Sequence, residues 1–354
     1  MFITGGAGFI GSAVIRYLLK NTDIHIINID KLTYAGNLNS IPKSLLGDKY
    51  SLEKIDICNR NKISDLFKKY KPDCVMHLAA ESHVDRSIEN SDDFIKTNIL
   101  GTYNLLEESR IYYESLDKTK NNFFKFHHVS TDEVYGDLGL TGGSFKETTK
   151  YNPSSPYSAS KASSDHLVRA WWRTYKLPIL ITNSSNNYGP FHFPEKLIPH
   201  IIISAINGND LPLYGTGLQI RDWLYVEDHA KALFKVISEG EIGETYNIGG
   251  NVEKTNIEVV TKICEILDEK IRNKPKNIKS YSELIKHVPD RPGHDMRYSI
   301  DASKIYNKLG WAPKETFDSG LEKTVEWYLN NKEWWESLIK SKYNMRRLGV
   351  YNQK

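Results

Sequence analysis

Residues 5–11 are Gly5-Gly6-Ala7-Gly8-Phe9-Ile10-Gly11, a glycine-rich turn between a short apolar run and an amphipathic segment. Gly6, Gly8 and Gly11 have the G-x-G-x-x-G spacing, which lets a backbone turn tightly and bring helix N–H groups to a pyrophosphate. The next apolar run ends at Asp30, 19 residues beyond Gly11, where a carboxylate can bind an adenosine ribose. Because that carboxylate would repel a 2′-phosphate, the turn predicts a site for NAD rather than NADP.

Apolar runs rich in Ile and Val alternate with longer amphipathic segments through the first half of the chain. This alternation is typical of βαβ units, in which helices of a dozen or more residues connect parallel strands. It predicts a Rossmann-type, doubly wound α/β fold whose first strand is short, since only four residues precede Gly5. We expect strands at Met1–Thr4, Ile24–Ile29, Ser51–Lys54, Cys74–Leu78, Lys125–Ser130 and Pro178–Asn183, and helices at Ala13–Lys20, Lys62–Tyr70, Phe94–Ser115 and Tyr157–Tyr175.

The alternation loosens after Tyr188-Gly189-Pro190, where Gly, Pro and charged residues become dense. We expect a smaller, discontinuous α/β domain there that binds the substrate. A helical pattern at Asp228–Ser238 and a strand pattern at Thr245–Ile248 indicate that the chain returns to the first domain. The expected division is 1–188, about 219–250 and 312–330 for the NAD-binding domain, and about 189–218, 251–311 and 331–354 for the substrate domain.

The composition is that of an ordinary globular chain, with 47 Lys and Arg against 44 Asp and Glu and 40% apolar residues. This near balance gives no electrostatic reason to expect nucleic acid or a membrane as a partner. Cys58, Cys74 and Cys264 are scattered, which argues against a disulfide framework or a zinc site. Since no basic leader or long apolar stretch follows Met1, we expect a cytoplasmic protein.

Tyr157 and Lys161 are four residues apart in a segment predicted to be helical, so both side chains lie on one helix face. A nearby ammonium favours the phenolate, so Tyr157 could take a proton from a sugar hydroxyl. We expect Lys161 also to hold the nicotinamide ribose. Such a pair alone is usually a solvated helix face, but here it follows a dinucleotide motif and a strand ending in Ser130-Thr131.

The sequence closely resembles the extended short-chain dehydrogenase/reductase superfamily over nearly its whole length, and within it the dTDP-glucose 4,6-dehydratase family. Besides the glycine turn and the Tyr–Lys pair, several longer segments carry the resemblance. They are Thr131-Asp132-Glu133-Val134-Tyr135-Gly136, Asp30-Lys31-Leu32-Thr33-Tyr34-Ala35-Gly36-Asn37, Leu78-Ala79-Ala80-Glu81-Ser82-His83-Val84-Asp85-Arg86-Ser87, Ser185-Asn186-Asn187-Tyr188-Gly189-Pro190, Phe193-Pro194-Glu195-Lys196-Leu197, Arg221-Asp222 and Asp290-Arg291-Pro292-Gly293-His294.

Asp132 and Glu133 are the most telling residues for the chemistry. Like charges raise one another's pKa, which helps one carboxyl stay protonated as an acid while the other acts as a base. An elimination of water needs both. The resemblance implies that Asp132 is the general acid and Glu133 the base. The alternative is a pair of solvated turn carboxylates.

The resemblance implies a reaction in three steps at one hexose ring. Tyr157 removes the proton of the 4-hydroxyl, with Thr131 bonded to the same oxygen, while hydride passes from carbon 4 to NAD. Glu133 then abstracts the proton on carbon 5 and Asp132 protonates the departing 6-hydroxyl. Hydride returns to carbon 6, so a tightly bound NAD is regenerated in each cycle. The product, dTDP-4-keto-6-deoxyglucose, would serve the biosynthesis of rhamnose or another deoxysugar.

The resemblance also implies the residues of each site. The catalytic residues are Thr131, Asp132, Glu133, Tyr157 and Lys161. The cofactor-binding residues are Gly5, Gly8, Phe9, Ile10, Gly11, Asp30, Lys31, Leu32, Thr33, Asp56, Ile57, Leu78, Ala79, Ala80, Ser82, Thr97, Tyr157, Lys161 and Asn187. The substrate-binding residues are Ser82, His83, Arg86, Thr131, Asp132, Glu133, Asn186, Lys196, Leu197, Pro212, Tyr214, Arg221, Asn247, Asp290, Arg291, His294 and Tyr298. Arg221 and Arg291 suit a pyrophosphate, because a guanidinium can bond phosphate oxygens bidentately.

Other functions stay open at this stage. UDP-glucose is an alternative substrate, since the motifs do not separate thymidine from uridine. A nucleotide-sugar 4-epimerase would share the glycine turn and the Tyr–Lys pair but has no use for Asp132 and Glu133. A non-catalytic NAD sensor would keep the glycines but could lose Tyr157 and Lys161. The resemblance further implies a homodimer that pairs through the helices that include Phe94–Ser115 and Tyr157–Tyr175.

Two other groups of residues have simpler interpretations. The adjacent His127 and His128 do not indicate a metal site, because neighbouring residues of a strand point to opposite faces. We expect no metal. The pairs Trp171-Trp172 and Trp334-Trp335 are expected in packing or at an interface rather than as platforms for nucleic-acid bases.

Overall fold

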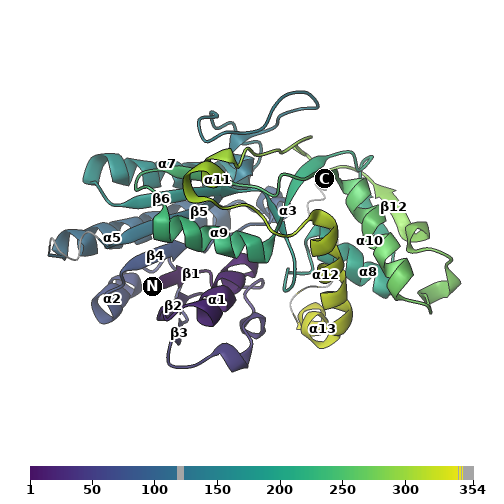
Figure 1. The fold of residues 1–354 in the computed structure, drawn as a ribbon, viewed down its shortest axis with the longest axis horizontal. Coiled ribbons are helices and arrows are strands. Elements are labelled where there is room, and N and C mark those ends of the chain that lie inside the picture. The colour runs from purple at the N-terminus through teal and green to yellow at the C-terminus, as the bar shows by residue number, and fades with distance from the viewer. Residues whose placement is uncertain (118–122, 342, 344, 346–354) are drawn as a thin grey trace.

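The computed structural model describes residues 1–117, 123–341, 343 and 345. Its larger part holds a seven-stranded sheet, all parallel, in the order β10-β6-β5-β4-β1-β2-β3 (Figure 1). The order reverses direction next to β1, which makes this a doubly wound Rossmann-type sheet, as predicted. Its strands are β1 (Phe2–Thr4), β2 (Ile26–Ile29), β3 (Tyr50–Glu53), β4 (Cys74–His77), β5 (Lys125–Thr131), β6 (Ile179–Ser184) and β10 (Thr245–Ile248).

The short first strand is fully formed. Each of its three residues pairs with β2 on one side and β4 on the other, as in the partnership of Phe2 with both Ile27 and Val75. Phe2 and Ile3 are completely buried. Three residues are enough here because both neighbouring strands satisfy the backbone of β1, so the strand needs no length of its own to be stable.

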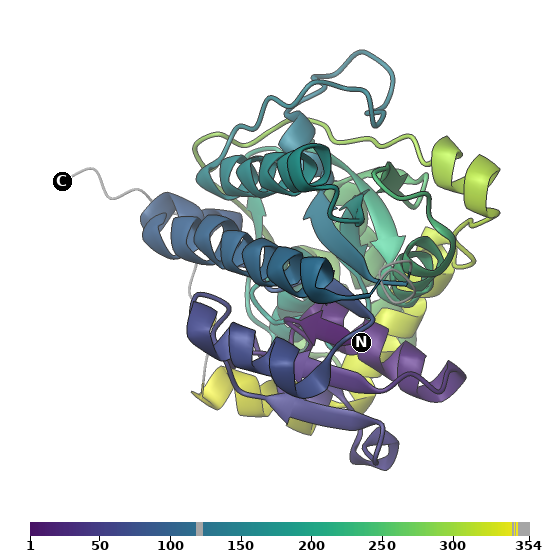
Figure 2. The same cartoon turned by 90° about the vertical axis from the view of Figure 1, so that its left-hand side faces the viewer.

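Helices cover both faces of the sheet. On one face α1 (Phe9–Asn21) packs against α9 (Val226–Glu239), with α11 (Ser303–Leu309) beside α9 and β10. On the other face α2 (Arg60–Tyr70), α5 (Thr102–Ser115) and α7 (Pro156–Tyr175) lie side by side (Figure 2). The carboxyl ends of the central strands therefore open toward the smaller part of the molecule.

The predicted helix over 94–115 differs in detail. It begins as α4 (Asp92–Phe94), continues as a π-helix from Ile95 to Gly101 and becomes the regular helix α5 at Thr102. A π-helix is a wider turn that commonly occurs at functional sites. Here it contains the buried Asn98, whose amide donates to Ser160 Oγ at 2.8 Å and to the carbonyl of Glu81 at 3.0 Å. The turn thereby joins α7 to the segment after β4.

The smaller part contains two short sheets and four helices, on the right of Figure 1. The sheets pair β11 (Glu253–Thr255), β9 (Ile220–Tyr225) and β7 (Asn186–Tyr188), and β12 (Ile285–Val288) with β8 (Leu211–Tyr214). The helices are α8 (Leu197–Ile206), α10 (Asn256–Lys270), α12 (Phe317–Asn330) and α13 (Lys332–Ser341), and between β4 and α4 lies the short α3 (Val84–Glu89). A separate apolar core lies among them.

The packing differs from the expected domain division in two places. Helix α12, expected in the NAD-binding domain, buries Phe317, Leu321 and Val325 in the core of the smaller part. Helix α11, expected in the substrate domain, packs through Ile305 and Leu309 onto the core of the large sheet. The apolar face of each helix fits one core only. The spacing of apolar residues along the sequence predicts that face but does not show which core it meets. The last residues of the segment 331–354 lie outside the described part of the chain.

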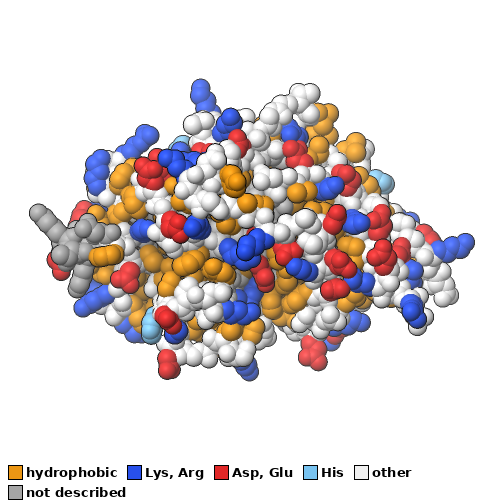
Figure 3. Space-filling view, in the orientation of Figure 1, with side chains coloured by type: hydrophobic (Ala, Val, Ile, Leu, Met, Phe, Trp, Pro, Cys, Tyr) orange, Lys and Arg blue, Asp and Glu red, His pale blue; other side chains and the backbone are white. Residues whose placement is uncertain are grey.

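The surface and the cysteines agree with the composition. Lys and Arg side chains are interspersed with Asp and Glu over the face shown in Figure 3. Cys58, Cys74 and Cys264 are all free thiols. Within the described residues, none of the helices combines the length and the apolar character needed to span a bilayer.

The buried side chain of His127 leads to a first prediction. Burial lowers the pKa of His127 to about 3, so this side chain stays neutral in the folded protein while the unfolded chain binds a proton below pH ~6.5. As pH falls below ~6.5, protonation of His127 in the unfolded chain stabilises the unfolded state, so the folded protein loses stability. His127→Gln removes the contact with Thr182 (3.0 Å), an effect that is measured alone near pH 7.5. Below pH ~6.5 the free energy of unfolding of the variant, relative to that of the wild type, should rise by about 1.4 kcal/mol for each pH unit of acidification. Urea titrations at several pH values measure this difference. A pH-independent difference between His127→Gln and wild type would contradict the prediction.

Candidate active site

The five predicted catalytic residues meet at one cavity of 290 Å³. Thr131 ends β5, and Asp132 and Glu133 follow at once in a short 3₁₀ turn, so their backbone is fixed by the central sheet. Tyr157 and Lys161 come from the first turns of α7, which begins with a Ser155 capping box and Pro156. Ligands of open α/β sheets bind at the carboxyl ends of the strands, and this cavity lies there.

The glycine turn has the shape needed for a dinucleotide. Gly5 has a φ of +71°, and a Cβ there would lie 2.7 Å from the backbone nitrogen of Ala79. A Cβ on Gly11 would lie 2.2 Å from the carbonyl oxygen of Gly5, so neither position accepts another residue. Helix α1 starts after Gly8, and neither a side-chain cap nor an acidic residue blocks its first N–H groups. These features fit a pyrophosphate at the helix N-terminus.

Asp30 directly follows β2 and lies at the edge of a small adjoining cavity of 60 Å³. Its two carboxylate oxygens accept hydrogen bonds from Ala7 N at 2.9 Å and Leu32 N at 2.7 Å. The carboxylate therefore joins the glycine turn to the loop after β2. Its position beside the cavity is the one predicted for a group that binds the adenosine ribose.

The surroundings of Asp132 and Glu133 act differently on the pKa of each carboxyl. Asp132 is 1% exposed, and burial together with the charges of Glu133 and Asp222 raises its pKa well above the usual value. Burial also raises the pKa of Glu133, but Arg291, Arg221 and Lys196 favour its ionised form. The geometry thus gives one carboxyl suited to donating a proton beside one suited to accepting it.

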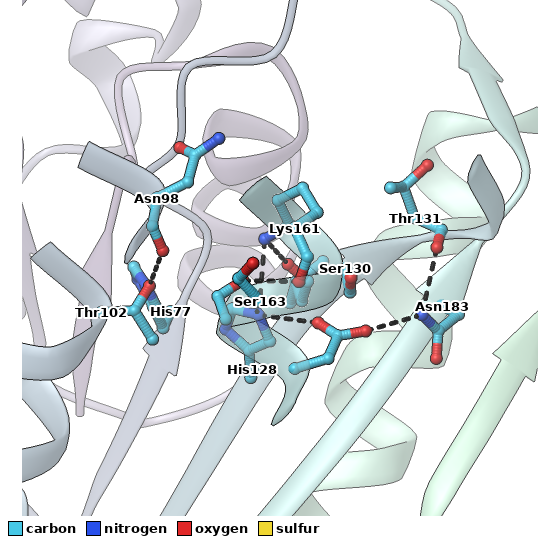
Figure 4. Close-up of polar contacts among 12 residues, drawn as sticks. His77, Asn98, Thr102, His128, Ser130, Thr131, Lys161, Ser163 and Asn183 are labelled. Carbon is cyan, nitrogen blue, oxygen red and sulfur yellow. Dashed lines mark hydrogen bonds and ion pairs between the residues drawn. The ribbon is translucent and has the colours of Figure 1, made fainter. Parts of the chain in front are cut away.

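Tyr157 differs from the expectation in one respect. Its pKa is raised, mainly by burial and then by the charge of Glu133, so the structure does not favour the phenolate. The ammonium of Lys161 is bonded elsewhere: its Nζ donates to the carbonyl of Val129 at 2.9 Å and lies 3.4 Å from His128 Nε2 (Figure 4). The phenolate that a nearby ammonium was expected to favour is therefore not favoured by the protein groups around Tyr157.

A second cavity of 530 Å³ adjoins the first and is rich in cations. Arg221 is buried, stacks 4.3 Å above the ring of Tyr298 and donates to the carbonyls of Ile220 and Asp295. Arg291 lies 3.3 Å from Asp85, and Lys196 donates to the carbonyl of Ser82 at 2.9 Å. Three cations around one cavity suit a diphosphate.

The two cavities meet along a shared wall. The residues that line both are Glu133, Asn186, Glu195, Lys196, Leu197 and Trp223. A molecule in the second cavity can therefore reach the predicted catalytic residues in the first. This arrangement fits a nucleotide sugar whose hexose lies against Glu133 while its diphosphate lies among the arginines.

Most predicted cofactor-binding residues line the cavities. Those at the first cavity are Gly5, Phe9, Ile10, Gly11, Leu78, Ala80, Ser82, Tyr157, Lys161 and Asn187. Those at the small cavity are Gly5, Asp30, Lys31, Thr33, Ile57, Ala79, Ala80 and Thr97. Gly8 caps α1, Leu32 lies in the loop held by Asp30, and Asp56 lies in a shallow depression 3.8 Å from Lys31.

The predicted substrate-binding residues divide in the same way. Those at the first cavity are Ser82, Thr131, Asp132, Glu133, Asn186, Lys196 and Leu197. Those at the second are His83, Glu133, Asn186, Lys196, Leu197, Pro212, Tyr214, Arg221, Arg291, His294 and Tyr298.

Three predicted substrate-binding residues are not brought to either cavity. The Asn247 amide is buried and bonded to Tyr135 and to the carbonyl of Phe145, which commits it to the fold. Arg86 is paired with Glu195 at 3.0 Å, and Asp290 with His294 at 2.6 Å. Arg86 and Asp290 therefore hold residues that line the site, Glu195 and His294, rather than line it themselves.

The structure also places residues that sequence reasoning missed. Glu195 lines both cavities and its side chain, 2% exposed, binds Arg86 and the hydroxyl of Tyr34. Asn256 lines the second cavity at the start of α10. Asp165 is buried one helical turn beyond Lys161, a spacing of four that could have indicated it.

The adjacent histidines point to opposite faces of β5, as predicted. His127 contacts Thr182, whereas His128 faces Lys161. Among the residues that the structure describes, no three His, Cys, Asp or Glu side chains are grouped as a metal site requires.

Known proteins share this sequence and this fold. Residues 2–324 match the model of a family described as GDP-mannose 4,6 dehydratase. The dTDP-glucose 4,6-dehydratase of Neisseria meningitidis serogroup B is 59% identical over 350 residues, 99% of each chain. That of Salmonella typhimurium is 61% identical over 342 residues, 94% of each chain.

Solved structures agree. The dTDP-glucose 4,6-dehydratase of Bacillus anthracis in complex with NAD is 44% identical, with a TM-score of 0.84 over 95% of this chain and 98% of that chain. The UDP-glucose 4-epimerase of Thermus thermophilus with NAD is 27% identical, with a TM-score of 0.80 over 93% of this chain and 99% of that chain.

The fold and the site together define an extended short-chain dehydrogenase/reductase, in which a dinucleotide turn and a Tyr–Lys pair share one cavity. The identity over the full length is more specific than this class. The chain belongs to the dTDP-glucose 4,6-dehydratase family.

Proposed function

We propose that this protein is an NAD-dependent hydro-lyase that converts dTDP-glucose to dTDP-4-keto-6-deoxyglucose and water. The observation that carries the proposal is the buried Asp132 next to the cavity-lining Glu133, in the same cavity as Tyr157 and Lys161. An acid and a base side by side fit an elimination. A 4-epimerase has no elimination to catalyse and would gain nothing from the cost of burying this pair.

The cofactor fits the residues that are present. The glycine turn would hold the pyrophosphate, Asp30 the adenosine ribose, and Tyr157 and Lys161 the nicotinamide end. NAD, when bound, supplies a positive charge that favours the phenolate of Tyr157, together with a reversible acceptor for the hydride of carbon 4.

The side chains then divide the proton transfers. Tyr157 takes the proton of the 4-hydroxyl, and Thr131 hydrogen-bonds the same oxygen. The ketone that forms acidifies the proton on carbon 5, which Glu133 removes. Asp132, kept protonated by burial, gives its proton to the departing 6-hydroxyl, so that water leaves across carbons 5 and 6. The cations of the second cavity hold the diphosphate throughout.

The direct test is to incubate the purified protein with dTDP-glucose and to measure the alkali-dependent absorbance of a 4-keto-6-deoxy sugar. We expect product without added NAD if the cofactor copurifies. UDP-glucose assayed in parallel separates the two nucleotide bases, and we expect much slower turnover with it. If neither nucleotide sugar gave product, the proposed function would be wrong.

We further propose a homodimer that pairs through the helical face formed by the π-helix, α5 and α7. These elements lie side by side on one side of the sheet (Figure 2). They expose large apolar side chains, with Ile95 at 51%, Leu100 at 48%, Ile111 at 45% and Tyr175 at 42%. Apolar side chains gathered on one face favour a protein partner.

Leu100→Arg should convert the dimer to a monomer, because an unpaired charge is expensive to bury in an apolar interface. Analytical ultracentrifugation of both forms at micromolar concentration measures the change. The matched control is Leu140→Arg, which places the same charge on a leucine that is exposed elsewhere. A Leu100→Arg variant that sediments as a dimer would show that the interface lies on another face.

We also assign the protein to the cytoplasm. Three free thiols fit a reducing compartment, and nucleotide sugars and NAD are metabolites of that compartment.

A further inference from the structure

The ammonium of Lys161 is buried among neutral groups. Its Nζ donates to the carbonyl of Val129 at 2.9 Å, and its other neighbour is His128 Nε2 at 3.4 Å. Lys161 is 4% exposed. A buried charge is expensive unless an opposite charge compensates it, and neither contact supplies one.

The compensating charge is Asp165. Its Oδ1 lies 3.1 Å from His128 Nε2, on the same ring nitrogen that faces Lys161. Asp165 and His128 are both fully buried. Burial opposes the ionised carboxylate, but the His128 hydrogen bond and the charges nearby hold the pKa of Asp165 below its usual value. Asp165 is therefore an anion beneath the catalytic lysine.

The second carboxylate oxygen reaches the other side of the site. Asp165 Oδ2 accepts hydrogen bonds from the Tyr151 hydroxyl at 2.8 Å and from Asn183 Nδ2 at 3.2 Å. The same Asn183 nitrogen donates to the carbonyl of Thr131 at 3.0 Å. Figure 4 shows the resulting chain of contacts between Lys161 and His128 and between Asn183 and Thr131.

We propose that Asp165 is a positioning residue: its charge compensates Lys161 across the His128 ring nitrogen that lies between them, and through Asn183 it fixes the end of β5 that carries Thr131. One buried carboxylate thereby sets the distance between two residues from different elements that must meet at one sugar hydroxyl. The inference rests on the proposed function, because it concerns the residues assigned there to the first hydride transfer.

The charged and titratable groups that face Lys161 make the test possible. They are His77 from β4, His128 from β5, and Tyr157 and Asp165 from α7. Burial lowers the pKa of Lys161 to about 8, and Asp165 acts in the opposite direction. Burial keeps both histidines neutral, since it lowers the pKa of His128 to about 4 and that of His77 well below its usual value. Removing the anion should lower the pKa of Lys161. Because the ammonium exists only below that pKa, the loss of activity at alkaline pH should begin at a lower pH than in the wild type.

The experiment measures reduction of bound NAD by dTDP-glucose in a single turnover as a function of pH. Asp165→Asn, which keeps the shape and removes the charge, should move the alkaline limb of this profile down by about 1 to 3 pH units. NAD affinity, measured by calorimetric titration over the same pH range, should weaken with the same shift. His128→Leu should give a similar shift because it removes the hydrogen bond that keeps Asp165 ionised, and it carries the test if Asp165→Asn does not fold.

His127→Gln is the matched control, since this histidine is buried on the same strand but faces Thr182 on the opposite side. It should leave the alkaline limb in place, which separates an effect on Lys161 from a general loss of core stability. If Asp165→Asn and His128→Leu both fold and keep the wild-type limb, the inference is overturned. Wild-type turnover is measured first: its absence would refute the proposed function, whereas a normal wild type with unshifted variants would refute the role of Asp165 alone.

Discussion

The Asp132→Asn variant should reduce its bound NAD when given dTDP-glucose, yet release water about 100 to 10,000 times more slowly than the wild type. The reason is that burial and Glu133 keep Asp132 protonated, so its role is to donate a proton, and an amide of the same size cannot do this at the leaving hydroxyl. Stopped-flow absorbance should show reduced cofactor accumulating, a species that turns over in the wild type.

The same variant should be at least as stable as the wild type. Folding raises the pKa of the Asp132 carboxyl above its ordinary value of 3.8. The stability of the folded protein therefore decreases as pH rises above 3.8, because the unfolded chain can ionise this carboxyl more easily. Asn carries no such cost, so thermal unfolding near neutral pH should occur at an equal or higher temperature. This control excludes misfolding as the cause of slow elimination. If cofactor reduction failed as completely as elimination, the assignment of Asp132 to the second step would be wrong.

Tyr157→Phe should lose cofactor reduction itself, by about 100- to 10,000-fold. Phe keeps the buried ring, which packs 6.3 Å from the ring of Phe94, but removes the only group assigned to take the proton of the 4-hydroxyl. No later step can then begin. Single-turnover absorbance measures reduction directly, and binding of NAD and dTDP-glucose should change little because the cavity keeps its shape.

The two variants separate the two halves of the reaction. Asp132→Asn should form reduced cofactor without product, whereas Tyr157→Phe should form neither. Rapid reduction by Tyr157→Phe would mean that another group accepts the proton, and the assignment of Tyr157 would have to be abandoned.

The large sheet could be predicted because most of its strands are short apolar runs, and several of them, such as β1 and β4, are followed by helices. The glycine turn also has only one sterically allowed interpretation, since a side chain at Gly5 or Gly11 would collide with backbone atoms. The places of α11 and α12 could not be predicted, because their apolar faces are alike in the sequence and differ only in which core they meet.

The site shows the same limit. Asp132, Glu133, Tyr157 and Lys161 were found because they are close in the chain to a strand end or to each other. Asp165 was missed although it is four residues from Lys161, because spacing alone does not show that a carboxylate is buried. The burial that raises the pKa of Tyr157 is likewise a property of several packed elements, and the spacing of Tyr157 and Lys161 does not reveal it.

The most direct test follows one hydrogen atom. When dTDP-glucose carries deuterium on carbon 4 and is converted in unlabelled water, we expect the deuterium to appear on carbon 6 of a 4-keto-6-deoxy product, as read by mass spectrometry and NMR. Deuterium that returned to carbon 4 of an intact hexose would instead indicate an epimerase. That result would mean that Asp132 and Glu133 do not remove water between the two hydride transfers.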